Sequence, residues 1–167
     1  FSYSFLLIYV GSLKLEATFL FQIQILLYLL FTVVASITSL PFGWLADKVG
    51  RKTALILAFI FWGAVCFGFP YATSLAPIVA LFVLYGVHKG AIEPSQKALV
   101  SELSPTTYRA STLGAFQMIT GLFALPASFI AGWLWVTFGS LVPFYLSFAL
   151  AAAASVLLLF VREKKRV

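Results

Sequence analysis

The residues best suited to chemistry lie inside one long apolar run, about residues 76–103. Within it, His88, Lys89 and Glu93 place three ionisable groups within six residues. A charge at the centre of a bilayer costs about 2.5–3.5 kcal/mol on insertion scales, so such groups need a partner or a task. Lys89 and Glu93 are four residues apart, a spacing at which two side chains meet on one helix face. The pair predicts either a binding or proton-transfer site or a structural ion pair.

The residues around this pair indicate a bent and closely packed helix. Pro94 has no N–H, so it leaves a carbonyl of the preceding turn without its usual donor and favours a kink. Gly86 and Gly90 form a small-xxx-small face that allows another helix to approach. His88 is suited to relaying a proton near neutral pH or to packing through a hydrogen bond. Together these features predict a helix that lines a polar cavity.

Uncharged polar residues in other apolar runs extend the candidate site. Gln22, Gln24 and Gln117 either face a cavity or form hydrogen bonds between helices. The residues predicted for a substrate or proton pathway are Tyr85, His88, Lys89, Glu93 and Gln117. We predict no metal site and no cofactor.

The composition indicates which elements must position these residues. Of the 167 residues, 62% are hydrophobic and 10% are charged, whereas soluble domains carry about 25% charged residues. The apolar runs are too long for barrel strands and lack strict alternation, so we expect membrane-spanning helices. Their predicted ranges are about 1–12, 19–45, 54–71, 76–103, 105–137 and 141–161. Ser104 and Pro105 are expected to begin the fifth helix as its N-cap and first residue.

The first run is too short to cross a bilayer, and residue 1 is not Met, so we expect the start of a longer chain to be missing. Basic residues gather at three places on one side of a serpentine six-helix path. They are Lys48, Arg51 and Lys52, then Lys97 and Arg109, then Arg162, Lys164, Lys165 and Arg166. The positive-inside rule makes this side, and the C-terminus, cytoplasmic. The same distribution argues against a nucleic-acid-binding role for the net charge of +6.

A second chemical motif occupies residues 43–52. Asp47 and Arg51 are four residues apart and can pair across one helical turn, while glycines suit a tight turn. The motif residues are Gly43, Asp47, Lys48, Gly50, Arg51 and Lys52. The cluster predicts either a latch between helix bundles or a solvated loop that only sets topology.

Part of this motif recurs later in the chain. Gly43, Trp44 and Leu45 are followed by Gly50, and residues 132–134 repeat Gly-Trp-Leu with Gly139 at the same spacing. The two copies fall on opposite sides of the expected membrane, which favours an inverted repeat of two three-helix units. Chance similarity is the alternative.

Residues 43–52 closely resemble the signature loop of the major facilitator superfamily, Gly-x-Leu-Ala-Asp-Arg-x-Gly-Arg-Arg/Lys, with Lys48 replacing the usual Arg. The stretch from Ser104 to Gly114 is similar to the segment between the tenth and eleventh helices of that family. The resemblance implies an all-α membrane protein, with residues 1–167 as the C-terminal six-helix half, helices seven to twelve. It also implies a missing N-terminal half as partner and secondary active transport of a small solute by alternating access, coupled to protons or another ion.

Two other function classes compete with transport. One is a non-transporting membrane scaffold or receptor, and the other is an intramembrane enzyme. The sequence lacks His-Glu-x-x-His, Gly-x-Ser-x-Gly and a phosphate-binding loop, and its one aspartate, Asp47, lies in the predicted loop. We therefore predict no enzyme, with a small-molecule substrate and the lipid bilayer as partners and a prokaryotic plasma membrane as location.

Overall fold

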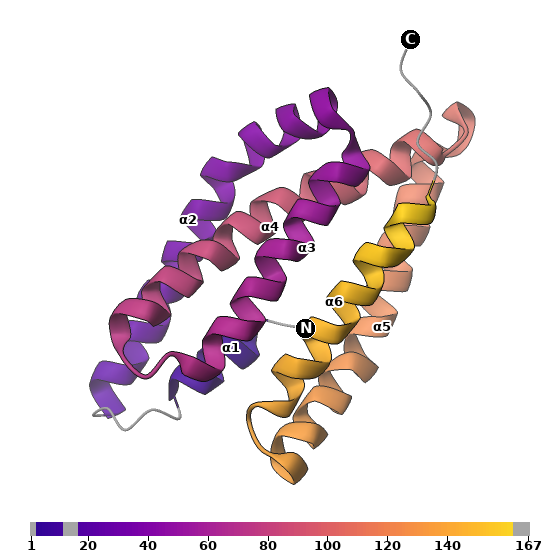
Figure 1. Ribbon diagram of the computed structural model, residues 1–167. Coiled ribbons are helices and arrows are strands. Elements are labelled where there is room, and N and C mark those ends of the chain that lie inside the picture. The colour runs from indigo at the N-terminus through magenta and orange to yellow at the C-terminus, as the bar shows by residue number, and fades with distance from the viewer. Residues whose placement is uncertain (1–2, 12–16, 162–167) are drawn as a thin grey trace.

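The computed structural model (Figure 1) describes residues 3–11 and 17–161, which form helices joined by short connections. The helices are α1 (Tyr3–Gly11), α2 (Ala17–Val49), α3 (Arg51–Gly68), α4 (Leu75–Leu103), α5 (Arg109–Phe138) and α6 (Val142–Phe160), with 3-10 turns η1 (Phe69–Tyr71) and η2 (Thr106–Tyr108). The described part of the chain contains no strand, so the predicted all-α class is confirmed. The predicted basic tail at 162–166 and the connection at 14–16 lie outside the described residues.

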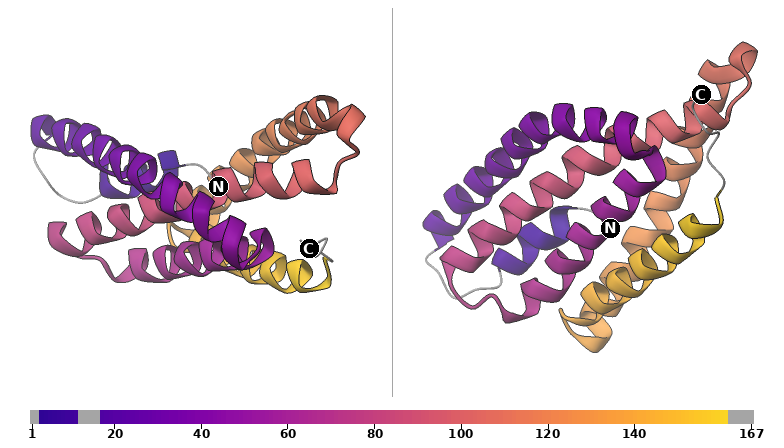
Figure 2. Two further views of the ribbon diagram at one scale, coloured as in Figure 1. Left: turned by 90° about the horizontal axis from the view of Figure 1, so that it is seen from above. Right: turned by 45° about the horizontal axis from the view of Figure 1, so that its top comes forward.

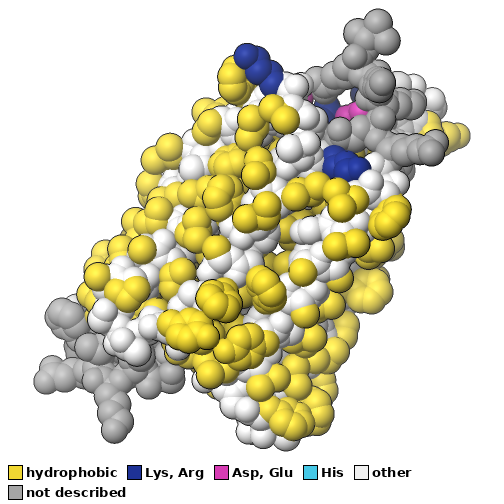
Figure 3. Space-filling model, in the orientation of Figure 1, with side chains coloured by type: hydrophobic (Ala, Val, Ile, Leu, Met, Phe, Trp, Pro, Cys, Tyr) yellow, Lys and Arg dark blue, Asp and Glu magenta, His cyan; other side chains and the backbone are white. Residues whose placement is uncertain are grey.

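Among the described residues, five helical segments are long and apolar enough to cross a membrane. They are Gln22–Val49, Arg51–Tyr71, Leu75–Leu103, Thr106–Phe138 and Val142–Phe160. The shortest has 19 residues, which at about 1.5 Å per residue matches the roughly 30 Å hydrocarbon core. On the face shown in Figure 3, hydrophobic side chains cover most of the described surface, and Lys and Arg appear only towards one end. An apolar surface with its charges at one end is typical of a protein that contacts lipid.

The helices pack side by side with α4 at the centre. It contacts α2 on one side and α3 on the other, and α6 packs against α3, whereas α5 diverges from α6 away from the turn that joins them (Figures 1 and 2). Aromatic rings fill the core where the chain returns from α3 to α4. Phe69 stacks on Phe144 with ring centroids 5.6 Å apart and meets Phe82 at 5.8 Å. All three side chains are fully buried, so this cluster holds α3, α4 and α6 together at one end.

The predicted loop at residues 43–52 is almost entirely helical, which corrects its expected boundaries. Helix α2 continues to Val49 rather than ending near residue 45, and α3 begins at Arg51 rather than near residue 54. Only Gly50 lies between them, with φ 106° and ψ 143°. Gly43 is inside α2, where an added Cβ would meet nothing within 4 Å. The tight turn therefore needs one glycine, because Gly50 alone adopts a left-handed φ.

The second copy of the motif ends in the same way. Gly139 follows α5 with φ 98° and ψ 166°, and it shares a positive φ only with Gly50 among the described residues. An added Cβ at Gly132 would meet nothing within 4 Å, as at Gly43. The α2–α3 junction and the α5–α6 turn lie at opposite ends of the bundle in Figure 1.

The predicted start of the fifth helix at Ser104 and Pro105 is wrong. Ser104 closes α4, and its hydroxyl donates back to the carbonyl of Val100. Pro105 is extended, η2 follows, and α5 begins at Arg109. The reason is local, because a residue before proline is driven out of the helical region, and Ser104 has φ −85° and ψ 142°.

Candidate functional site: an ion pair between two cavities and a clasp at one end of the bundle

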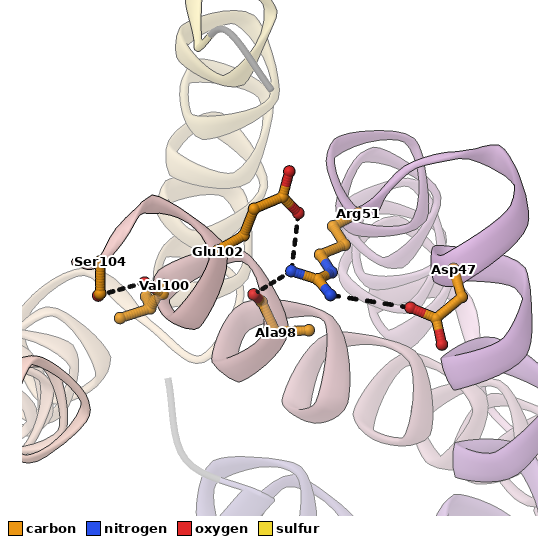
Figure 4. Close-up of polar contacts among 6 residues, drawn as sticks. All are labelled: Asp47, Arg51, Ala98, Val100, Glu102 and Ser104. Atoms are coloured by element: carbon orange, nitrogen blue, oxygen red, sulfur yellow. Dashed lines mark hydrogen bonds and ion pairs between the residues drawn. The ribbon is translucent and has the colours of Figure 1, made fainter. Parts of the chain in front are cut away.

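Arg51 ties the first turn of α3 to the last turns of α4 (Figure 4). Its Nη1 donates to Glu102 Oε2 at 2.7 Å and to the Ala98 carbonyl at 2.7 Å. The predicted contact with Asp47 is present but longer, with 3.8 Å between Nη2 and Oδ1. The side chains of Arg51 and Glu102 are only 16% and 15% exposed, against 59% for Asp47. We call Asp47, Arg51 and Glu102 the clasp, and Glu102 is its main anion.

The neighbouring lysines have different partners. Lys52 Nζ donates to the carbonyls of Leu159 and Val161 at 2.6 and 3.2 Å. These carbonyls lie at the C-terminal end of α6. The last carbonyls of a helix have no backbone N–H of the same helix to accept from, so a lysine can donate to them instead. Lys48 instead places its Nζ 4.0 Å from the centre of the Trp44 ring, in a cation–π contact. Lys52 therefore fastens α6 to α3, whereas Lys48 contacts only its own helix in this way.

Lys89 and Glu93 form the predicted ion pair, with 2.7 Å between Nζ and Oε1. Their side chains are 33% and 56% exposed, and both residues line two separate cavities. Cavity A has a volume of about 620 Å³ and lies among α3, α4, α5 and α6. Cavity B has a volume of about 450 Å³ and lies among α1, α2 and α4. The pair thus forms part of the wall between a cavity on each side of α4.

Cavity A has a polar, aromatic wall on α3 and α4 and a mostly apolar wall on α5 and α6. His88 Nδ1 lies 2.8 Å from the Ala58 carbonyl, which can only accept, so Nδ1 carries the proton. The imidazole stacks on Trp62 with centroids 5.2 Å apart, and Trp62 Nε1 donates to Ser147 Oγ at 2.9 Å. Tyr85 contacts both rings. His88 is therefore a buried, hydrogen-bonded packing residue in this geometry.

Cavity B joins an aromatic patch to a row of hydroxyls. Its aromatic lining is Tyr3, Tyr28 and Phe31, whose ring centroids lie 5.2 to 5.6 Å apart. Its hydroxyl lining is Thr32, Ser36 and Ser39 on α2. On the facing helix, Gly90, Glu93 and Pro94 complete the wall beside Lys89. Nothing in the spacing of these residues along the sequence indicated that α1 and α2 would meet α4 here.

The two glycines of α4 lie where it crosses α2. A Cβ on Gly86 would approach the Phe31 carbonyl to 2.7 Å, and one on Gly90 would approach the Ala35 carbonyl to 2.6 Å. Real Cβ atoms essentially never come so close to backbone. The predicted small-residue face therefore sets a backbone-to-backbone contact, and it fixes α2 opposite the ion pair.

The glutamines are not brought together. Gln24 Nε2 donates to the Leu7 carbonyl at 2.9 Å and joins α1 to α2. Gln117 is exposed on α5 and lines neither cavity, and Gln22 is exposed on α2. Gln96, one turn beyond the ion pair, does line cavity A and was not predicted.

Residues 1–167, the whole chain, match the sequence profile of the Major Facilitator Superfamily. The chain belongs to this family. It is 42% identical over 139 residues to an uncharacterized MFS-type transporter of Methanocaldococcus jannaschii, covering 83% of this chain and 35% of the relative. The predicted family and the predicted membrane class are therefore confirmed.

Two further relatives are named for their substrates. A probable galactarate/D-glucarate transporter of Bacillus subtilis is 30% identical over 110 residues, covering 62% of this chain and 24% of the relative. A 4-hydroxybenzoate transporter of Acinetobacter baylyi is 30% identical over 103 residues, covering 62% of this chain and 22% of the relative. The chain thus spans about a third or less of the length of these relatives. They are named as transporters, in agreement with the prediction that the chain is not an enzyme.

Proposed function

We propose that this chain is the C-terminal six-helix half of a secondary active transporter that moves a small solute by alternating access. The observation that carries the proposal is the Lys89–Glu93 pair, which lies within an apolar span and lines two cavities. Charged groups inside a bilayer typically mark substrate or ion pathways. Family membership supports the same reading. The missing partner is the N-terminal half, which would complete the cavity walls.

The residues predicted for the substrate or proton pathway differ in which cavity they line. Lys89 and Glu93 are accessible from both cavities, so they are the groups that bind solute or carry the coupled proton or ion. Tyr85 and His88 shape cavity A and hold its polar wall. Gln117 contributes only if the N-terminal half covers α5, because nothing in the described residues encloses it.

The clasp belongs to the cytoplasmic end in this proposal, in a prokaryotic plasma membrane with the C-terminus inside. Its short contacts join α3 to α4 within this half, so they stiffen one bundle, while the exposed Asp47 lies at the edge where a second bundle could dock. The similar backbones at Gly50 and Gly139, at opposite ends, support two inverted three-helix units.

The proposal is tested with the full-length protein in proteoliposomes. Organic acids are the first solutes to try, since two relatives are named for galactarate/D-glucarate and 4-hydroxybenzoate. Gradient-driven uptake of labelled D-glucarate or 4-hydroxybenzoate should fall at least about tenfold in Glu93→Gln, the loss of roughly 1.4 kcal/mol of stabilisation. Lys97→Gln, an exposed residue of α4 that lines neither cavity, is the matched control.

Unchanged uptake with an unchanged pH dependence in Glu93→Gln would remove Glu93 from the mechanism. The absence of gradient-driven flux of both acids in the unaltered protein would favour the non-transporting scaffold instead.

A further inference from the structure

The hydroxyl row of cavity B presents hydrogen-bond acceptors. Thr32, Ser36 and Ser39 donate their protons to carbonyls of their own helix, at 2.8, 2.9 and 2.9 Å. Each hydroxyl oxygen has two lone pairs and one proton. With their protons committed to α2, these three hydroxyls offer lone pairs to the cavity.

A backbone carbonyl on the facing helix adds to this set. Gly90 has no side chain, so the atoms that it contributes to cavity B are backbone atoms. Its carbonyl would normally accept from the N–H of residue 94, but residue 94 is proline and has none. Gly90 and Pro94 both line cavity B. The Gly90 carbonyl therefore lacks its intrahelical donor, in a residue that lines the same cavity as the hydroxyl row.

The strongest acceptor of the cavity already holds an ammonium group. Glu93 Oε1 lies 2.7 Å from Lys89 Nζ, and both residues line cavity B. Tyr3, Tyr28 and Phe31 also line the cavity, and aromatic rings attract cations. The lining thus combines a carboxylate paired with Lys89, neutral oxygen acceptors, two phenol hydroxyls and aromatic rings, and the carboxylate, acceptors and rings suit a group with several N–H donors and a positive charge.

We propose that cavity B is a subsite for a primary ammonium group of the ligand, which binds the Glu93 carboxylate beside Lys89. This inference rests on the proposed function, since it assigns part of the transported solute. The ammonium group belongs either to a simple organic amine or to an amino acid.

The test measures thermal unfolding of the purified full-length protein in detergent with matched ligands at equal concentrations. One set is phenylalanine, phenethylamine and hydrocinnamate, and a smaller set is alanine, ethylamine and propionate. Within a set, the first compound carries both charges, the second lacks the carboxylate and the third lacks the ammonium group. We expect the ammonium-bearing compounds of at least one set to raise the unfolding midpoint by a few degrees near saturation, and the carboxylate-only compounds to leave it unchanged.

The compounds that carry the ammonium group alone show whether the ligand is a simple organic amine or an amino acid. Protection by phenethylamine or ethylamine assigns an organic amine, and protection by phenylalanine or alanine alone assigns an amino acid. Equal protection by the carboxylate-only compounds, protection by sodium chloride alone, or no protection by any compound would overturn the subsite.

Paired variants locate the effect. Ser36→Ala removes one acceptor of cavity B, and we expect it to weaken the protecting ligand about fivefold, the worth of one ordinary hydrogen bond. Thr120→Ala is the control, because its hydroxyl also donates to its own helix, at 3.0 Å, but lines neither cavity. Equal weakening by the two variants would contradict the location.

Failure of this inference is distinguishable from failure of the proposed function. Gradient-driven uptake of an organic acid without amine protection leaves transport standing and removes the subsite. Amine protection without any gradient-driven flux leaves the subsite standing and removes transport.

Discussion

At the scale of single residues, the three basic side chains between positions 48 and 52 have different surroundings. Lys48 lies over an exposed ring, Arg51 is largely buried against Glu102, and Lys52 caps α6. Charge alone would make them equivalent, but the energy of an ion pair depends on burial and hydrogen-bond geometry. Arg51 has both, so it should dominate the stability of this end of the bundle.

Glu102→Gln should therefore destabilise the protein more than Asp47→Asn. Loss of a short, largely buried charged hydrogen bond costs about 1.5–3 kcal/mol, whereas an exposed pair at 3.8 Å is worth about 0–1 kcal/mol. Equilibrium unfolding of the two full-length variants in detergent measures the difference. An equal or larger cost for Asp47→Asn would show that the described Arg51–Glu102 contact is not the stabilising one.

At the scale of elements, the crossing of α2 and α4 determines where the ion pair and the hydroxyl row meet. The crossing depends on two glycines that admit backbone contact. By contrast, a Cβ added to the glycines of α5 at 114, 121 and 132 would meet nothing within 4 Å. The same residue type thus serves close packing in one helix and leaves an open surface in another.

Gly90→Ala should cost about 1–3 kcal/mol, because its methyl group would press on the Ala35 carbonyl and force the helices apart. Gly121→Ala should be neutral or stabilise by up to about 1 kcal/mol through helix propensity. Unfolding midpoints of the two variants make the comparison. A neutral Gly90→Ala would mean that α2 and α4 are not in backbone contact.

At the scale of the whole molecule, the chain runs back and forth so that the clasp and the α5–α6 turn lie at opposite ends (Figure 1). The end that carries the clasp also carries Lys48, Lys52 and the end of α6. Cations are retained on the cytoplasmic side during membrane insertion. The fold and the charge distribution therefore lead to one expected orientation.

Single cysteines introduced at Lys48 and Ser140 of the full-length protein, with Cys66 replaced by Ser, test that orientation. A membrane-impermeant maleimide should label position 48 in inverted vesicles and position 140 in right-side-out vesicles. A Cys66→Ser protein without added cysteine is the background control. Labelling of both positions from the same side would refute the topology and the inverted repeat with it.

Local patterns were sufficient to predict that the helices exist and to predict contacts within one helix, but they did not give every helix boundary. Apolar run lengths predicted the spans, and i,i+4 spacing predicted the Lys89–Glu93 pair, because both depend on neighbours along the chain. The glycine face was visible for the same reason. The start of α5 was also a local feature, since Pro105 restricts Ser104, but capping statistics pointed the other way.

Contacts between helices could not be predicted from spacing. Glu102 is 51 positions from Arg51, and the carbonyls that Lys52 meets are more than 100 positions away. Cavity B likewise depends on three helices meeting. Such partners follow from the packing of whole helices, which one sequence does not encode as a periodic signal.

The close crossing at Gly86 and Gly90 has a mechanical consequence. Two helices whose backbones touch cannot slide or part without losing that fit, so we expect the α2 and α4 walls of cavity B to move together as one block. A solute that contacts these two walls would keep those contacts while the rest of the transporter opens inward or outward. Any difference in affinity between the two sides of the membrane must then arise from the parts that move against this block.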